Sequence, residues 1–116
     1  MTYTFTFEPD YSRIMMACII DARASIPAIK NQVGSVIKDY VDEQLAMINS
    51  DSIVYKIETE LGVLAGFFAL QVNIKNKTAT LITQVLRPAF KTVSEIPVLI
   101  GNFINITKVW QQDYLF

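Results

Sequence analysis

The sequence predicts an α+β domain in which helices cover both faces of a mostly antiparallel sheet. Strand-like alternation occurs once near the N-terminus and three times in the centre of the chain, and segments with helical spacing lie between and after these stretches. Only short turns join the central strands, so they pair antiparallel. With 116 residues, 52% of them hydrophobic and 18% charged, we expect one folded domain over residues 1–116.

The N-terminal segment predicts a strand followed by a helix. Residues 2–8 alternate, which places Tyr3, Phe5 and Phe7 on one face of a strand. Ile14 and Cys18 then begin an apolar stripe at helical spacing. Cys18 is expected to lie in the core as an unreactive thiol, because no base flanks it.

A second helix is predicted from Ser25 to about Asn49. Ser25 is suited to the N-cap and Pro27 to the first turn. The apolar residues that follow repeat at helical spacing, although Gly34 weakens the interior by about 1 kcal/mol relative to Ala. We therefore expect two consecutive helices between the first strand and the central block.

The central block predicts three strands, at residues 53–58, 63–72 and 79–86. The middle strand is apolar on both faces, which is typical of a strand inside a sheet covered on both sides. Gly62 can adopt the positive φ of the hairpin before it. A stripe from Ile96 predicts the last helix, and residues 108–116 are interpreted as a further strand. The predicted order is β-α-α-β-β-β-α-β.

Composition excludes several classes of function. The chain has no histidine and one cysteine, which removes the usual ligands of a zinc site and the general base of Ser-His-Asp and Cys-His hydrolases. A net charge of −1 argues against nucleic acid as a partner. No apolar run approaches the roughly 20 residues that cross a bilayer, and the N-terminus does not resemble a signal peptide. We expect no metal, no membrane and a reducing, cytoplasmic setting.

A loop at residues 87–96 joins the last central strand to the last helix. Lys91, Thr92, Val93 and Ser94 indicate an anion site at the helix N-terminus, where hydroxyls and free amides can hold a phosphate. The same residues also fit ordinary helix capping, because Thr92-x-x-Glu95 matches a capping box. Arg87 and Lys91 are similarly either a small basic patch or solvated surface.

Two motifs resemble the GNAT acyltransferase superfamily: Gly62-Val63-Leu64-Ala65-Gly66-Phe67-Phe68-Ala69-Leu70 and Pro88-Ala89-Phe90-Lys91. This resemblance covers residues 2 to about 106. It implies a GNAT-like fold, acetyl-CoA or another acyl-CoA as cofactor, and a small amine that attacks the thioester directly. It also implies that acyl-CoA lies along the end of the third central strand and the following loop, at Val85, Leu86, Lys91, Thr92, Val93 and Ser94.

The loop departs from the glycine-rich acyl-CoA motif of that superfamily. Ser94 and Ile96 stand at the two glycine positions, and the branched side chain of Ile96 is expected to obstruct the approach of the backbone to a phosphate. Glu95 adds negative charge close to the expected phosphates. The alternative hypothesis is therefore a non-catalytic binding or assembly module, expected to be a homodimer because of its high apolar content. No residue is identified as catalytic, since Glu58 and Glu60 fit either a proton-relaying acid or a surface role.

Overall fold

The computed structural model describes residues 2–49, 51–73, 75–76 and 78–114, with side chains up to residue 105. Along this part of the chain, strands, α-helices (α) and short 3-10 helices (η) follow in the order β1 (Tyr3–Phe7), α1 (Tyr11–Asp21), η1 (Arg23–Ser25), α2 (Gly34–Ala46), β2 (Ser52–Thr59), β3 (Leu64–Asn73), β4 (Thr78–Leu86), η2 (Pro88–Phe90) and α3 (Glu95–Tyr114).

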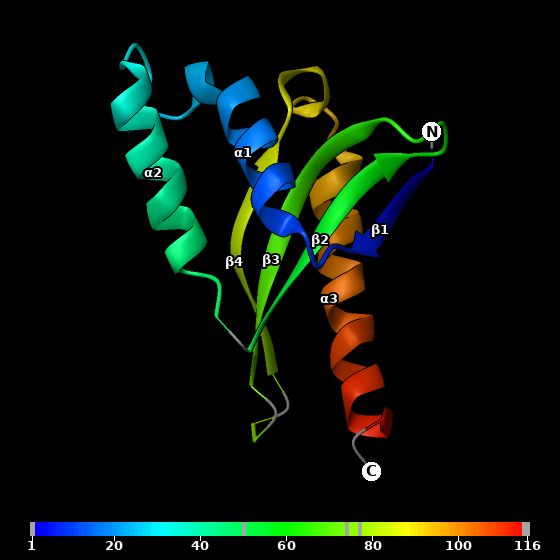
Figure 1. Cartoon of the computed structure of the whole chain (residues 1–116). Helices are drawn as coiled ribbons and strands as arrows, with labels where there is room; N and C mark the ends of the chain where they lie inside the picture. Colours follow the sequence, from blue (N-terminus) through cyan, green and yellow to red (C-terminus); the bar gives the residue numbers. More distant parts are fainter. Residues whose placement is uncertain (1, 50, 74, 77, 115–116) are drawn as a thin grey trace.

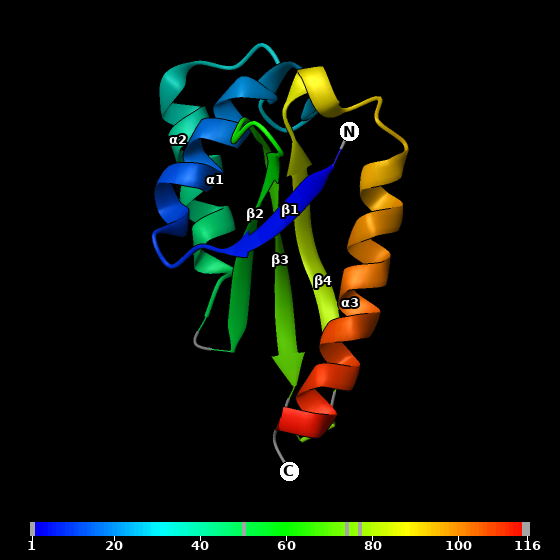
Figure 2. The ribbon, with the colours of Figure 1, turned by 90° about the vertical axis from the view of Figure 1, so that its right-hand side faces the viewer.

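The strands form one antiparallel sheet in the order β1-β2-β3-β4. Helices α1 and α2 lie on one face of the sheet and α3 lies on the other (Figures 1 and 2). The predicted α+β class, with helices on both faces of an antiparallel sheet, is confirmed. Within the described residues, β1 and β4 are the edge strands.

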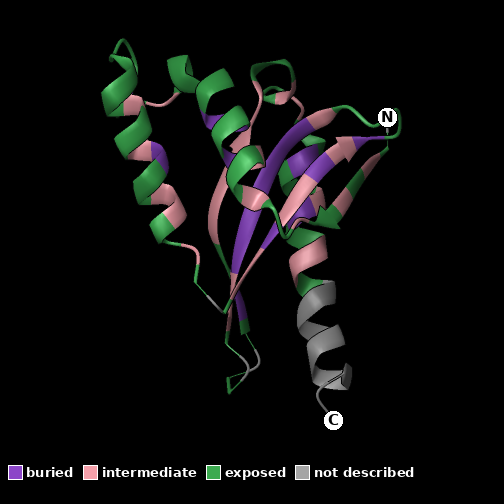
Figure 3. Cartoon of the chain, in the orientation of Figure 1, coloured by how far each residue is buried: buried purple, intermediate pink, exposed green. Residues whose placement is uncertain are grey.

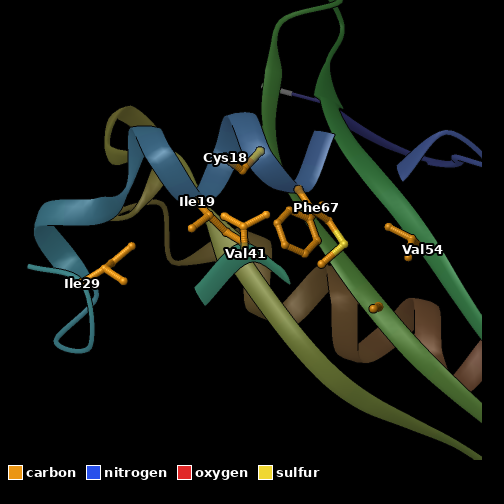
Figure 4. Packing of buried hydrophobic residues seen from close by; sticks show 8 residues of the cluster. Cys18, Ile19, Ile29, Val41, Val54 and Phe67 are labelled. Atoms are coloured by element: carbon orange, nitrogen blue, oxygen red, sulfur yellow. The ribbon is translucent and has the colours of Figure 1, made fainter. Parts of the chain in front are cut away.

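Burial on both faces of β3 produces two hydrophobic clusters. Residues Ala65–Leu70 are all buried (Figure 3), as expected for a strand covered on both sides. Phe67 and Ala69 face α1 and α2, where Cys18, Ile19, Ile29, Val41 and Val54 pack with them (Figure 4). Ala65, Phe68 and Leu70 face α3 and pack with Ile96 and Ile100.

Aromatic rings fill the α3 side of the sheet. The ring of Phe68 lies 5.2 Å from that of Phe5 and 5.8 Å from that of Phe103, both edge to face. Tyr55 stacks on Phe68 with ring centres 5.3 Å apart. These offset and edge-to-face geometries are the favoured ones for aromatic pairs. They dock α3 onto β1, β2 and β3.

Gly66 allows β3 and β4 to approach each other closely. It pairs with Leu86 in the register of the two strands. A Cβ atom at this position would collide with the carbonyl oxygen of Val85 and lie 3.0 Å from the Cα of Leu86. The glycine is therefore needed for space, whereas Gly62 in the preceding hairpin is needed for its φ of 80°, as predicted.

The second helix begins later than the sequence predicts. Helix α2 starts at Gly34 and not near Pro27, and η1 and a series of turns occupy the residues before it. Asn31 has a φ of 63°, a left-handed conformation that cannot continue a right-handed helix. Ile29 is nevertheless buried against α1 and β3, so the apolar pattern in this segment reflects core packing.

The prediction of a strand at residues 108–116 is wrong for residues 108–114, which are helical. Helix α3 continues to Tyr114, and residues 115–116 lie outside the described part of the chain. After Gly101 the segment contains neither glycine nor proline. Nothing in this stretch therefore interrupts the helical hydrogen bonds once Glu95–Ile100 has started the helix.

Candidate functional site

A groove of about 300 Å³ lies where β4 ends. Its walls come from three parts of the chain: the end of β4, the segment that follows α1, and the segment that leads into α3. The lining residues are Ala22, Ser25, Ile26, Gln84, Val85, Leu86, Lys91 and Pro97. The lining is mostly apolar and includes one hydroxyl, one side-chain amide and one ammonium group, the composition that small-molecule sites usually have.

The structure brings together half of the predicted cofactor-binding residues. Val85, Leu86 and Lys91 all line the groove. Val93 instead packs against the cluster beneath α3. Thr92 and Ser94 are exposed on the loop and do not line the groove. The groove thus coincides with the strand end and the basic residue, and the rest of the predicted loop lies beside it.

Arg87 is held by the protein and is not available as part of a basic patch. Its Nε donates to Oδ2 of Asp21 over 2.8 Å, and one Nη donates to the carbonyl oxygen of Leu64 over 3.2 Å. The hydrogen bond to Asp21 raises the pKa of Arg87 above its ordinary value. Lys91 makes no ion pair within the described residues. It is the one cation of the predicted pair that can meet a ligand.

The loop before α3 retains some anion-binding capacity. Three of its amides donate to the carbonyl three residues earlier over 3.1–3.3 Å, those of Lys91, Val93 and Ile96. Within the described residues, the amides of Thr92, Ser94 and Glu95 donate to no backbone carbonyl. These amides lie at the positive end of the α3 dipole. The free amides are compatible with an anion site. The predicted Thr92–Glu95 capping box is wrong, because α3 begins only at Glu95 and neither side chain makes a capping hydrogen bond within the described residues.

The branched side chain at position 96 does not cover the loop. Ile96 is fully buried beneath α3 and packs against the sheet. The expected obstruction of a phosphate by this side chain is therefore wrong, because core packing draws it away from the loop. Glu95 is exposed in the first turn of α3. Its carboxylate is the group that opposes an anion there.

The predicted acids lie away from the groove. Glu58 makes an ion pair with Lys56 at 3.2 Å, and Lys56 also lies 3.6 Å from Glu8. The hydrogen bond to Glu58 raises the pKa of Lys56. Glu60 is exposed after β2. None of these carboxylates lines the groove, and Glu58 and Glu8 are each paired with the half-buried Lys56.

Cys18 is buried between α1 and the sheet, as predicted. Burial raises the pKa of its thiol to about 11, so the reactive thiolate is scarce at neutral pH. No group of three or more His, Cys, Asp or Glu side chains in the described part of the chain is arranged to hold a metal ion. No helix of residues 2–114 is long and apolar enough to cross a bilayer.

Sequence reasoning missed the groove residues outside the loop. Ala22, Ser25 and Ile26 reach the groove because α1 ends beside β4, a contact between segments about 60 residues apart in the chain. The local pattern around Ser25 matches a helix cap and gives no sign of this contact. Pro97 is the exception, because a proline that marks the first turn of the predicted last helix also marks a position next to the preceding loop.

Comparison of the whole fold with solved structures identifies the architecture. A GNAT-family acetyltransferase from Staphylococcus aureus Mu50 matches 96% of this chain and 69% of its own length, with a TM-score of 0.62 and 12% identity. The chain has the GNAT fold. A point mutant of spermidine N-acetyltransferase from Vibrio cholerae matches 97% of the chain and 66% of its own length, with a TM-score of 0.58 and 11% identity.

The match to GNAT-family proteins comes from comparison of the fold and not from comparison of the whole sequence. No family model matches the sequence, and no curated protein matches it significantly. The chain spans about two thirds of the length of the solved structures it resembles. The resemblance in Gly62–Leu70 and Pro88–Lys91 is thus confirmed at the level of the fold.

Proposed function

We propose that this GNAT-fold chain binds acyl-CoA in the groove at the end of β4 and does not catalyse acyl transfer by acid-base chemistry of its own. The observation that carries the proposal is the groove itself, which places Val85, Leu86 and Lys91 together beside the start of α3. Acetyl-CoA is the acyl-CoA to test first, because the structural neighbours are named as acetyltransferases.

The groove suits the pantetheine arm of the cofactor. The arm is a narrow chain with two amides, and Gln84 and Ser25 supply side-chain partners for such groups among apolar walls. Lys91 at the same groove offers a positive charge to a phosphate. The free amides of the loop add hydrogen-bond donors.

Glu95 weakens the phosphate end of the site. Its carboxylate lies in the first turn of α3, next to the amides that face a phosphate. Like charges at this range repel each other, and the opposing Lys91 is a single cation. We therefore expect affinity that is modest and strongly dependent on ionic strength.

The lining of the groove argues for binding without acid-base catalysis. Lys91 is its only titratable residue. An amine must lose a proton during acylation, and a carboxylate or histidine usually accepts it. Any turnover would then depend on direct attack by an amine that arrives deprotonated. Spermidine is the small amine to assay, since a structural neighbour from Vibrio cholerae is named for it.

The test is thermal melting of the whole chain with and without millimolar acetyl-CoA. Binding to the native state raises Tm in proportion to ln(1 + [L]/Kd). We expect Lys91→Gln to reduce the shift and Glu95→Gln to increase it. Lys75→Gln is the matched control, because Lys75 is exposed in the hairpin before β4. An absent Tm shift in both the wild type and Glu95→Gln would overturn the proposal.

The second candidate function is that of a non-catalytic assembly module that forms a homodimer. The edge strand β4 has nine residues, Thr78–Leu86, none of them charged. Natural edge strands of this length are normally protected by charges, bulges or a covering segment. β4 has an irregularity at Ile82 in its pairing with β3 but carries no charge. A partner strand from a second copy would satisfy the open backbone groups.

Matched lysine substitutions test this second candidate. Thr80 on β4 and Thr4 on β1 are both exposed threonines on edge strands. If β4 is the interface, Thr80→Lys shifts the chain from dimer to monomer in sedimentation equilibrium, and Thr4→Lys does not. A monomeric wild type at high concentration would exclude the module in this form.

The proposal places the chain in the cytoplasm and gives it no nucleic-acid partner. Its cysteine is free and buried, which suits a reducing compartment. Its net charge of −1 offers no general attraction to phosphate backbones. Fractionation of cells that express the tagged chain tests the location, and a gel-shift assay at low salt tests the nucleic-acid prediction.

A further inference from the structure

A second groove, of about 450 Å³, lies between α1 and α2. It shares no lining residue with the groove at the end of β4, so a ligand bound here does not depend on the proposed function. The lining residues are Met16, Ile20, Arg23, Gly34, Ile37, Lys38, Val41 and Asp42. Its volume falls in the range of small-molecule sites, about 300–1,000 Å³.

The walls of this α1–α2 groove are apolar and open to water. Met16 is 46% exposed and Ile20 is 41% exposed on α1, whereas Val41 of α2 is 2% exposed and belongs to the core beneath. Covering exposed apolar side chains is favourable by about 25 cal/mol per Å². An apolar body that fits between the helices therefore removes both its own surface and that of Met16 and Ile20 from water.

The charges at the groove leave one cation unbalanced. Lys38 and Asp42 pair with each other at 3.0 Å. Arg23 donates from one Nη to the carbonyl oxygen of Ile20 over 2.8 Å and makes no ion pair within the described residues. Asp21, two residues earlier, is held by Arg87. The guanidinium of Arg23 thus keeps donors and a full positive charge for a ligand.

We propose that the α1–α2 groove binds a small amphipathic anion, with its apolar body between the helices and its anionic end at Arg23. Medium-chain carboxylates belong to this class: a flexible apolar chain matches the walls, and one carboxylate matches the guanidinium of Arg23 at the groove. A cation of the same shape would meet Arg23 as a like charge.

Octanoate is the probe, with octylamine as a control that keeps the chain and reverses the charge. Titration of the isotope-labelled whole chain, followed by amide chemical shifts, reports both affinity and position. We expect octanoate to shift amides of α1 and α2 saturably, and octylamine to bind at least about tenfold more weakly, which corresponds to about 1.4 kcal/mol. Equal binding of the two probes, or no saturable binding of octanoate, would overturn the proposal.

Two variants locate the site. Gly34 lines the groove, and a Cβ at this position meets nothing within 4 Å, so we expect Gly34→Leu to place its side chain in the groove. Gly101→Leu is its matched control, since a Cβ at Gly101 of α3 also meets nothing. We expect Gly34→Leu to weaken octanoate binding about tenfold or more and Gly101→Leu to leave it unchanged.

Arg23→Gln keeps a side-chain donor for the carbonyl of Ile20 and removes the charge. It should weaken octanoate binding and leave octylamine binding unchanged or improved. Amide spectra and Tm establish that each variant is folded. A folded Gly34→Leu chain that binds octanoate as the wild type does would contradict the assignment of the groove.

Discussion

The Nε atom of Arg87 donates a hydrogen bond to Oδ2 of Asp21 over 2.8 Å and thereby joins the end of β4 to the end of α1. The same guanidinium reaches the carbonyl of Leu64 at the start of β3. Three elements therefore meet at one side chain. Because these contacts occupy Arg87, its role beside the groove is structural, and Lys91 is the cation of the loop that can meet a ligand.

The Arg87–Asp21 pair should contribute little to stability by its charges alone. The two side chains are 38% and 44% exposed, so water and salt screen their attraction. A double-mutant cycle with Arg87→Gln and Asp21→Asn should give a coupling energy below about 1 kcal/mol that falls with added salt. Urea unfolding of the four proteins measures it. A coupling energy that does not change with salt would contradict this.

Gly66→Ala should destabilise the chain by about 1–3 kcal/mol, because the added methyl group pushes against the backbone of Val85 and Leu86. Gly101→Ala is the matched control. It has open space in α3 and should stabilise the chain by up to about 1 kcal/mol through helix propensity. Chemical denaturation measures both. Equal effects of the two substitutions would show that β3 and β4 can separate without cost.

Phe68→Ala should cost about 3–5 kcal/mol, because this fully buried ring contacts Phe5, Tyr55 and Phe103. Phe7→Ala provides the comparison: this ring is 57% exposed and contacts Tyr55 with ring centres 6.5 Å apart. We expect its cost to be several-fold smaller. Calorimetric unfolding of the two variants gives the difference, and similar values would refute the packing of α3 against this cluster.

Cys18 should make stability depend on alkaline pH. Burial raises the pKa of the folded thiol from 9.0 to about 11. The folded state therefore holds its proton more tightly than the unfolded state does, and this contribution is fully present below pH 9 and is lost as pH rises toward 11. Cys18→Ala removes this pH-dependent contribution to the free energy of unfolding. The wild type should lose more stability than Cys18→Ala between pH 9 and pH 11 in urea titrations.

Thiol labelling provides an independent measurement on Cys18. A disulfide reagent at pH 8 should react with the native chain at least about a hundredfold more slowly than with the chain in 8 M urea, because burial and the raised pKa both suppress the thiolate. Rapid labelling of the native chain would contradict the buried position of this side chain.

Periodicity locates most of the sheet correctly. The three predicted central strands lie close to Ser52–Thr59, Leu64–Asn73 and Thr78–Leu86, because alternation is a local property that strand geometry imposes on neighbouring residues. Two predictions fail where a local signal has two solutions. Ser25 and Pro27 match a helix start, yet Asn31 takes a φ of 63° and delays α2. The β-prone residues after Lys108 remain in α3 as far as Tyr114.

The residues of the candidate site likewise fall into those that the sequence indicates and those that only the fold brings to the groove. Val85 and Leu86 end a recognisable strand and Lys91 lies in the loop after it. The resemblance to the GNAT superfamily implies all three as binding residues, and they line the groove. Ile26, about 60 residues earlier in the chain, lines the same groove, and no local pattern indicates such a contact. Likewise, the buried position of Ile96 depends on how α3 docks on Phe68.

The sequence by itself determined the α+β class, the buried central strand and the absence of histidine-based chemistry, since all three follow from residue types and their local spacing. Only the tertiary structure decided which segments meet: the pairing of Arg87 with Asp21, the groove at the end of β4 and the groove between α1 and α2. The physical reason is that spacing specifies the face on which a side chain lies, whereas docking of distant elements decides what that face contacts.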